Sequence, residues 1–205
     1  MTRLKVSGIT TAADAALAVE AGADIIACVL NPASPRYVTL EQVWSVRRAI
    51  PPEVLFVGIF VDAPVPVVQR IVSHCGMDRA QLFGREPRAL VDSMGRSFKA
   101  VTAATSSEVA EAARTYGHKR SGAPPDLLLH LVQAAETDWQ AVADASAHAN
   151  VVLASARLGE PEAVHEAVRV AHPWAIDVWE AVESVPGQLD RERLVRVAES
   201  VRSTN

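Results

Sequence analysis

The stretch Lys5-Val6-Ser7-Gly8-Ile9-Thr10 is a short apolar run that ends on a hydroxyl and a glycine and passes directly into an alanine-rich segment, 11–21. A second apolar run, Asp126-Leu127-Leu128-Leu129-His130, also ends abruptly on one polar side chain. In a parallel sheet that is buried on both faces, the interior positions are filled by aliphatic residues. We therefore expect Ser7 and His130, at the ends of their strands, to leave the core and enter a site.

The pattern of a short apolar run followed by a helical segment recurs about every 25 residues. The expected strands are 4–6, 24–30, 54–61, 80–83, 98–101, 126–130, 151–154 and 175–178, and the expected helices are 11–21, 39–50, 64–74, 86–94, 106–116, 138–148, 161–171 and 191–201. This alternation predicts an α/β fold, a single (β/α)8 TIM barrel with a closed eight-stranded parallel sheet, as one domain over 1–205. An open doubly wound sheet is the alternative, but 7–10 lacks the Gly-x-Gly-x-x-Gly spacing for a nucleotide.

Composition and charge narrow the class of partner. The chain has 205 residues, of which 49% are hydrophobic and 21% charged, with a formal net charge of -4. Since no long basic run is present, we expect a small-molecule partner and neither nucleic acid nor a membrane. Cys28 and Cys75 lack any pairing or ligand motif, which predicts buried free thiols and no metal site. Without an apolar leader or a membrane-spanning segment, a cytoplasmic protein is expected.

Seven segments resemble successive motifs of the phosphoribosylanthranilate isomerase family, in the family's order and over nearly the whole chain. They are KVSGIT (5–10), SPRYV (34–38), VGIFV (57–61), AQLFG (80–84), KA (99–100), TDW (137–139) and VESVPG (182–187). The resemblance implies a (β/α)8 barrel of tryptophan biosynthesis that needs no metal or organic cofactor. It also implies an Amadori rearrangement, in which a general acid opens a ribose ring and a general base then moves a proton from carbon.

Three site positions depart from the family pattern. Ser7 stands where the family has its catalytic cysteine, and because a hydroxyl titrates far above a thiol, Ser7 without a partner is a poor base. His130 stands where the family has an acidic residue, and Phe83 replaces a histidine. A histidine still exchanges protons near neutral pH, so we expect His130 to act as general acid or base. Ser7 is expected to orient the substrate or donate a hydrogen bond.

The family's glycine-rich phosphate loops have no glycine counterpart here. Their places read VQAA at 132–135, SA at 155–156 and WEA at 179–181. Glycine lets backbone N–H groups approach a phosphate closely, and Glu180 adds a repulsive carboxylate at this place. The expectation is that a phosphorylated substrate is bound poorly.

One binding residue of the family is retained at Arg36, which matches the arginine that holds the carboxylate of the anthranilate ring. Its guanidinium can grip a carboxylate through two parallel hydrogen bonds. Arg157 is a candidate for a replacement anion site. The other expected substrate contacts are Asp177 at the end of the eighth strand, Trp179, Glu180 and Phe83.

These features lead to a hypothesis about function. It is a divergent phosphoribosylanthranilate isomerase-like enzyme whose repurposed active site performs cofactor-independent isomerisation, dehydration or cyclisation on a carboxylate-bearing, non-phosphorylated small molecule. Efficient phosphoribosylanthranilate isomerase activity is not expected from such a site. Two alternatives stay open: a genuine phosphoribosylanthranilate isomerase of tryptophan biosynthesis, and a non-catalytic small-molecule-binding or scaffold protein. A monomer or a homodimer is expected.

Overall fold

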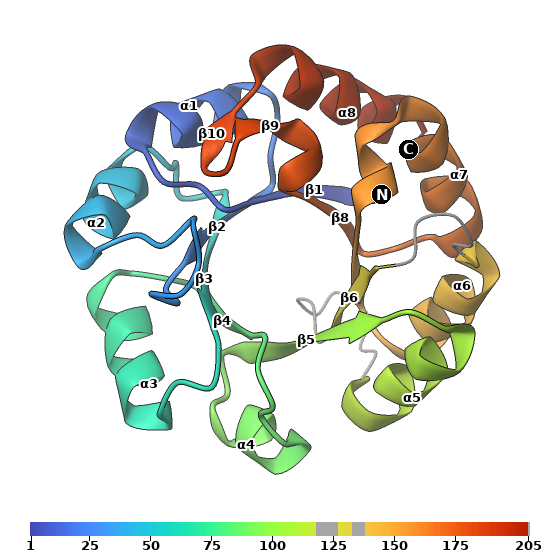
Figure 1. Ribbon diagram of the computed structural model, residues 1–205, viewed down its shortest axis with the longest axis horizontal. Coiled ribbons are helices and arrows are strands. Elements are labelled where there is room, and N and C mark those ends of the chain that lie inside the picture. Colours follow the sequence, from blue (N-terminus) through green and yellow to red (C-terminus); the bar gives the residue numbers. More distant parts are fainter. Residues whose placement is uncertain (118–126, 133–137, 205) are drawn as a thin grey trace.

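The computed structural model describes residues 1–117, 127–132 and 138–204. Its strands close into a parallel barrel in the order β1-β2-β3-β4-β5-β6-β7-β8, and the helices form a ring outside it (Figure 1). The strands are β1 Arg3–Ser7, β2 Ile25–Val29, β3 Leu55–Phe60, β4 Arg79–Leu82, β5 Ser97–Ala103, β6 Leu127–Leu131, β7 Val151–Ser155 and β8 Ala175–Val178. The helices are α1 Ala12–Glu20, α2 Leu40–Arg48, α3 Val65–His74, α4 Arg88–Ser93, α5 Ser106–Tyr116, α6 Trp139–His148, α7 Pro161–Ala171 and α8 Arg191–Thr204.

The predicted closed barrel is confirmed, and the pairing of β1 with β8 rules out the open-sheet alternative. Leu4 of β1 pairs with Ile176 of β8, and Val6 pairs with Val178, in parallel register. Since both ends of the sheet are joined in this way, no edge strand remains in the barrel that the described residues form.

Side-chain caps fix the start of several helices. The hydroxyl of Thr39 accepts from the backbone N–H of Gln42, whose side chain accepts from the Thr39 N–H, which forms a capping box before α2. Thr105 makes the corresponding box before α5, and the Asp138 carboxylate caps α6. Each cap satisfies backbone donors that a helix start leaves free, and contributes about 1 kcal/mol.

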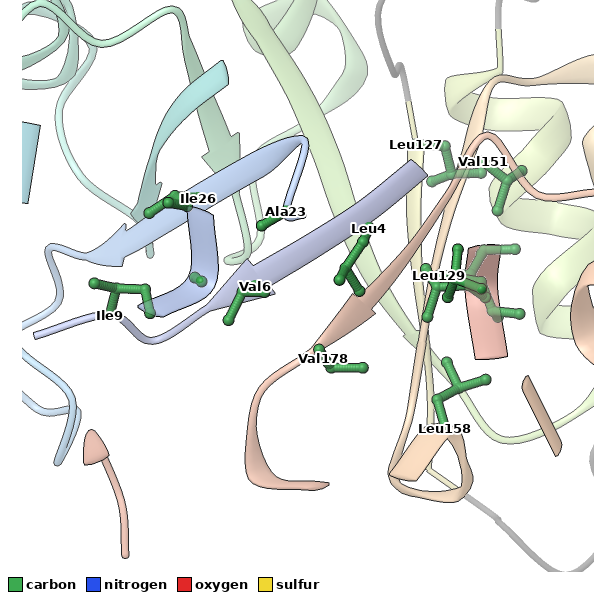
Figure 2. Close-up of a cluster of buried hydrophobic side chains, with 14 of the residues drawn as sticks. Leu4, Val6, Ile9, Ala23, Ile26, Leu127, Leu129, Val151, Leu158 and Val178 are labelled. Carbon is green, nitrogen blue, oxygen red and sulfur yellow. The ribbon is translucent and has the colours of Figure 1, made fainter. Parts of the chain in front are cut away.

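Alternation along the strands divides the core into two layers. The outer layer lies between strands and helices, and Figure 2 shows Leu4, Val6, Ile26, Leu129 and Val178 within it. The inner layer fills the barrel, and it consists of Ile25, Ala27, Val29, Val57, Ile59, Phe98, Ala100, Leu128, Val152, Ala154 and Ala175. Both layers are aliphatic for most of their length, as expected for a sheet with two buried faces.

The same alternation decides which polar side chains enter the barrel. Leu4 and Val6 belong to the outer layer, so the residues between and after them, Lys5 and Ser7, face inward. Asp177 lies between two outer-layer residues of β8, and His130 lies between two outer-layer leucines of β6. Four polar residues from β1, β6 and β8 therefore point into the barrel toward its carboxyl-terminal mouth.

Short elements that the sequence did not predict follow β7 and β8. They are the 3-10 helices η2 Ala156–Gly159 and η3 Glu180–Val182, and an antiparallel hairpin of β9 Glu183–Val185 and β10 Gln188–Leu189. The hairpin is anchored to the start of the chain, because Thr10 Oγ1 donates to the Gly187 carbonyl at 2.6 Å and Leu189 N donates to Asp14 at 3.4 Å. In the described ranges, no helix has the length and apolar character needed to cross a membrane.

Candidate functional site

Lys5, Ser7 and Asp177 form a buried cluster at the joint of β1 and β8. Lys5 Nζ donates to Ser7 Oγ, and it also donates to Asp177 Oδ2 at 2.6 Å. Ser7 Oγ donates to Asp177 Oδ1 at 2.7 Å, which closes a triangle of hydrogen bonds. Lys5 and Ser7 are 0% exposed and Asp177 is 2% exposed. An ion pair and a hydroxyl are thus held together inside the barrel.

Burial shapes the electrostatics of this cluster. It lowers the pKa of the Lys5 ammonium from its ordinary value of 10.5, and the attraction and hydrogen bond of Asp177 oppose part of that shift. Taking both charges out of water is costly unless further hydrogen bonds satisfy them. Ser7 supplies such a bond to each partner, so the hydroxyl is part of what keeps the pair inside the barrel.

His130, Phe83 and Trp179 form an aromatic cluster at the same mouth. The His130 ring lies edge-on to Trp179 at 5.1 Å between centroids and to Phe83 at 5.9 Å. Burial lowers the pKa of His130 from its ordinary 6.5, while the Asp177 and Glu180 carboxylates act in the opposite direction. His130 is therefore electrostatically connected to the buried cluster through Asp177.

Two side chains inside the barrel have buried polar atoms without a hydrogen-bond partner among the described residues. They are Gln81 on β4, with both its amide nitrogen and its amide oxygen, and His130, with its Nδ1 atom. Gln81 is 0% exposed. Buried polar groups are nearly always satisfied in folded proteins, so such atoms at a barrel mouth are available to a ligand.

Arg36, in the loop after β2, is paired with a carboxylate of the protein itself. Its Nε donates to Glu183 Oε1 at 2.8 Å and its Nη2 donates to Glu183 Oε2 at 2.6 Å. Glu180 lies at 3.6 Å from Nη2. The hydrogen bond from Arg36 to Glu183 raises the pKa of Arg36. Within the described ranges the Nη1 group makes no hydrogen bond to protein, so part of the guanidinium fork remains for a ligand.

Arg157 is placed apart from the other predicted residues, in η2 after β7. Its guanidinium carbon lies 5.7 Å from the ring centroid of Trp139, and its backbone N–H donates to Ser155 Oγ at 3.3 Å. The Glu180 side chain is 64% exposed at the start of η3. Most of the predicted phosphate place after β6, Gln133–Ala135, lies outside the described residues.

The predicted site residues thus fall into three groups. Ser7 joins Asp177, His130 joins Phe83 and Trp179, and Arg36 joins Glu180, whereas Arg157 stands alone. Sequence reasoning missed Lys5, Glu183 and Gln81. Lys5 and Gln81 carried a signal, since each is a long polar side chain inside an apolar strand. Glu183 carried none, because its role depends on how the hairpin folds back.

The part of the chain that the structure describes offers no metal centre. It contains no group of three or more His, Cys, Asp or Glu side chains that could hold a metal ion.

Comparison with known proteins points to one family. The family model described as N-(5'phosphoribosyl)anthranilate (PRA) isomerase matches residues 4–200. A relative from Geobacter sp. (strain M21), named N-(5'-phosphoribosyl)anthranilate isomerase, is 36% identical over 98% of this chain and 98% of its own. A relative of the same name from Pelobacter propionicus is 34% identical over 99% of this chain and 98% of its own.

Solved structures agree with these relatives. Phosphoribosyl anthranilate isomerase from Thermotoga maritima superposes with a TM-score of 0.87 at 28% identity, over 99% of this chain and 100% of that one. A phosphoribosyl anthranilate isomerase in complex with reduced 1-(o-carboxyphenylamino)-1-deoxyribulose 5-phosphate gives a TM-score of 0.84 at 28% identity, with the same coverage.

These findings overturn the functional hypothesis drawn from the sequence. Relatives at 34% and 36% identity over nearly the full length are named N-(5'-phosphoribosyl)anthranilate isomerase, which supports the alternative of a genuine isomerase. The expectation of a repurposed site that rejects a phosphorylated substrate was therefore wrong. Its weakness was physical: it judged Ser7 as an isolated hydroxyl, whereas the structure gives Ser7 two charged partners.

Proposed function

Because the chain belongs to the N-(5'-phosphoribosyl)anthranilate isomerase family, we propose that it catalyses the isomerisation of N-(5'-phosphoribosyl)anthranilate in tryptophan biosynthesis. The observation that carries this proposal is the family match over residues 4–200, which includes every strand end that builds the mouth. The product is 1-(o-carboxyphenylamino)-1-deoxyribulose 5-phosphate, whose reduced form is bound in one of the similar solved structures.

Arg36 binds the anthranilate carboxylate in this proposal. Its pairing with Glu183 fixes the plane of the guanidinium, and Nη1 is left to donate to the substrate acid. A guanidinium that is already oriented loses little side-chain entropy when it binds a carboxylate.

Arg157 is the proposed contact for the substrate phosphate. It lies in the turn after β7, on the barrel face where phosphate sites of this fold are found. A cationic side chain can provide the attraction that glycine-rich loops provide through backbone N–H groups. This assignment explains how a phosphorylated substrate is held although the expected glycines are absent.

His130 protonates the ring oxygen of the ribose, which opens the ring. Burial lowers the pKa of its imidazolium, which makes the protonated form a stronger acid, and the bound carboxylate and phosphate stabilise that form. The open-chain sugar then carries an iminium at carbon 1, and this makes the proton on the neighbouring carbon 2 acidic. Phe83 lies edge-on to His130 at 5.9 Å between ring centroids and fixes its orientation.

The test is steady-state conversion of N-(5'-phosphoribosyl)anthranilate by the purified protein, with substrate and product separated by chromatography. Arg36→Ala is expected to raise KM by about tenfold or more, since a hydrogen bond to a charged group contributes about 1.5–3 kcal/mol. Arg48→Ala, which removes an exposed arginine at the far end of α2, is the matched control and should leave KM unchanged.

Two outcomes would contradict the proposal. One is absence of turnover by the wild-type protein together with failure to complement a tryptophan auxotroph that lacks this isomerase. The other is binding of the substrate without turnover, which would favour the non-catalytic binding protein. A cytoplasmic location and a monomeric or homodimeric state belong to the same proposal, and cell fractionation and analytical ultracentrifugation would measure them.

A further inference from the structure

We propose that Ser7 is the general base of the isomerisation and that it acts through Asp177 and Lys5 as one proton relay. This proposal rests on the isomerase activity proposed above and assigns its second proton transfer. Ser7 Oγ takes the proton from carbon 2 of the opened sugar while its own proton passes to Asp177 Oδ1. Lys5 stabilises the negative charge that develops on Ser7 Oγ during the transfer.

The hydrogen bonds already have the directions that this step requires. Ser7 Oγ donates to Asp177 Oδ1 at 2.7 Å, so the outgoing proton is directed at a carboxylate oxygen before any substrate binds. Lys5 Nζ donates to Ser7 Oγ, which leaves the other lone pair of that oxygen to accept a proton from the mouth. The second Lys5 bond, to Asp177 Oδ2 at 2.6 Å, fixes the carboxylate in this orientation.

The charges around Ser7 allow its hydroxyl to act as a base, although an isolated hydroxyl would be too weak. A hydroxyl alone titrates far above neutral pH, but here the proton comes to rest on a carboxylate and not on an isolated alkoxide. The Lys5 ammonium is wholly buried, where its interaction with a developing negative charge is stronger than in water. Other charged groups lie at this end of the barrel: Glu180 acts on His130, and Arg36 and Glu183 lie beside Gly8, the residue after Ser7.

The proposed step conserves protons and electrons. The carbon 2–hydrogen bond breaks, its electron pair forms the double bond to carbon 1, and the iminium nitrogen accepts the charge. One O–H bond forms on Ser7 and one on Asp177 while the original Ser7 O–H breaks. Return of the proton through Ser7 to carbon 1 gives the ketose, and the hydroxyl on carbon 2 gives its proton back to His130.

Access to Ser7 involves Trp179. Ser7 is 0% exposed, and the β1–β8 register ends where Val6 pairs with Val178, so Ser7 and Trp179 are the next residues along the two strands. Trp179 is half-buried and follows the last residue of β8. In this proposal the substrate displaces the Trp179 ring from its contacts with His130 and Phe83, and the sugar carbon then reaches Ser7 Oγ from the mouth.

Asp177→Asn tests the relay, because an asparagine amide keeps the size of the side chain and cannot accept the proton. We expect kcat to fall by about 100-fold or more, with KM changed by less than about threefold. Ser7→Cys introduces a group that ionises without help. Asp177→Asn in the Ser7→Cys background should therefore lower kcat by less than about tenfold. Ser7→Ala combined with Asp177→Asn should be no slower than Ser7→Ala alone, since both changes remove one relay.

Asp24→Asn is the matched control for a carboxylate that supports β1 without entering the barrel. Asp24 accepts from the backbone N–H of Leu4 at 2.8 Å, at the opposite end of the strand from Ser7. The Asp24→Asn variant should have the kcat of the wild-type protein. If Asp177→Asn lowers kcat equally in the wild-type and Ser7→Cys backgrounds, its role is structural and the relay is overturned.

A measurement without turnover separates failure of the relay from failure of the proposed function. In Ser7→Cys, the thiolate is followed by its ultraviolet absorbance against pH, with the absorbance of the protein that retains Ser7 subtracted. Asp177→Asn should lower the pKa of this thiol, because it removes a negative neighbour and leaves the Lys5 ammonium. An unmoved thiol pKa would overturn the relay, whether or not the wild-type protein turns over the substrate.

Discussion

Replacement of Glu183 by glutamine tests whether one buried carboxylate holds Arg36 in place. Glu183 Oε2 accepts from Arg36 Nη2 at 2.6 Å, and Oε1 accepts from Arg36 Nε at 2.8 Å and from Gly187 N at 3.0 Å. A glutamine has one oxygen and one NH2 group. One of the donors from Arg36 or Gly187 must therefore face another donor.

The size of the effect follows from burial. The side chains of Arg36 and Glu183 are 13% and 4% exposed, so solvent screens the pair only weakly. A broken buried pair costs about 3–5 kcal/mol, and a single hydrogen bond to a charged group contributes about 1.5–3 kcal/mol. Because the guanidinium keeps some contact with water, we expect Glu183→Gln to lower the free energy of unfolding by about 2–4 kcal/mol.

Urea unfolding, followed by circular dichroism, measures this loss as a shift in the midpoint at unchanged slope. Glu180→Gln is the matched control, because it makes the same chemical change 3.6 Å from the same guanidinium but on a side chain that is 64% exposed. Glu180→Gln should lower the free energy of unfolding by less than about 0.5 kcal/mol. Equal stability of the two variants would refute the reasoning, since it would mean that burial does not strengthen the Arg36–Glu183 pair.

Four further predictions follow from local geometry and from the shifted pKa values. Gly8→Ala should destabilise the fold by about 1–3 kcal/mol in urea unfolding and raise KM, because Gly8 has φ +80° and a Cβ there would lie 2.7 Å from Arg36 Cδ. Burial raises the pKa of the Cys28 thiol from 9.0 to about 12, so between these values the thiol stays protonated in the folded protein and ionises in the unfolded chain. The free energy of unfolding should therefore fall between pH 9 and 12, and it should fall less in Cys28→Ala. Burial lowers the pKa of His130 below 6.5, so protonation favours unfolding; stability should fall as pH drops below 6.5, and less so in His130→Phe. The alkaline decline of kcat should lie at higher pH than that of kcat/KM, which pH–rate profiles would check, because the anionic substrate stabilises the imidazolium.

The barrel was predictable from the sequence because its signal is repeated. Aliphatic runs such as Leu127–Leu129 are buried on both faces, and a helical segment follows each strand, so one misjudged element would not have changed the class of fold. The η3 turn and the β9–β10 hairpin were not predictable in the same way. They are short, and contacts distant in sequence hold them, such as the bond from Thr10 to the Gly187 carbonyl.

The candidate site was predictable where a polar residue interrupts an apolar strand. Ser7 and His130 were found on that signal and Asp177 on its place in the family pattern, and the structure places all three on the inner face of the barrel. The hydrogen bond between Ser7 and Asp177 could not be predicted from the sequence, because the two residues are 170 positions apart and meet only when β1 pairs with β8. The pairing of Arg36 with Glu183 depends in the same way on the hairpin.

The error in the functional hypothesis has the same origin. Proton-transfer capacity belongs to a set of coupled groups, so a residue's intrinsic pKa decides little when a carboxylate and an ammonium lie within hydrogen-bond distance. A cysteine supplies an ionisable proton by itself, whereas Ser7 can match it only if Asp177 accepts the proton and Lys5 stabilises the oxygen. In the proposed relay, serine in place of cysteine makes the proton transfer depend on two neighbours that the barrel places beside Ser7, Asp177 and Lys5. If that reasoning holds, Asp177 is far more sensitive to substitution in the wild-type protein than in the Ser7→Cys variant, because only the hydroxyl depends on it.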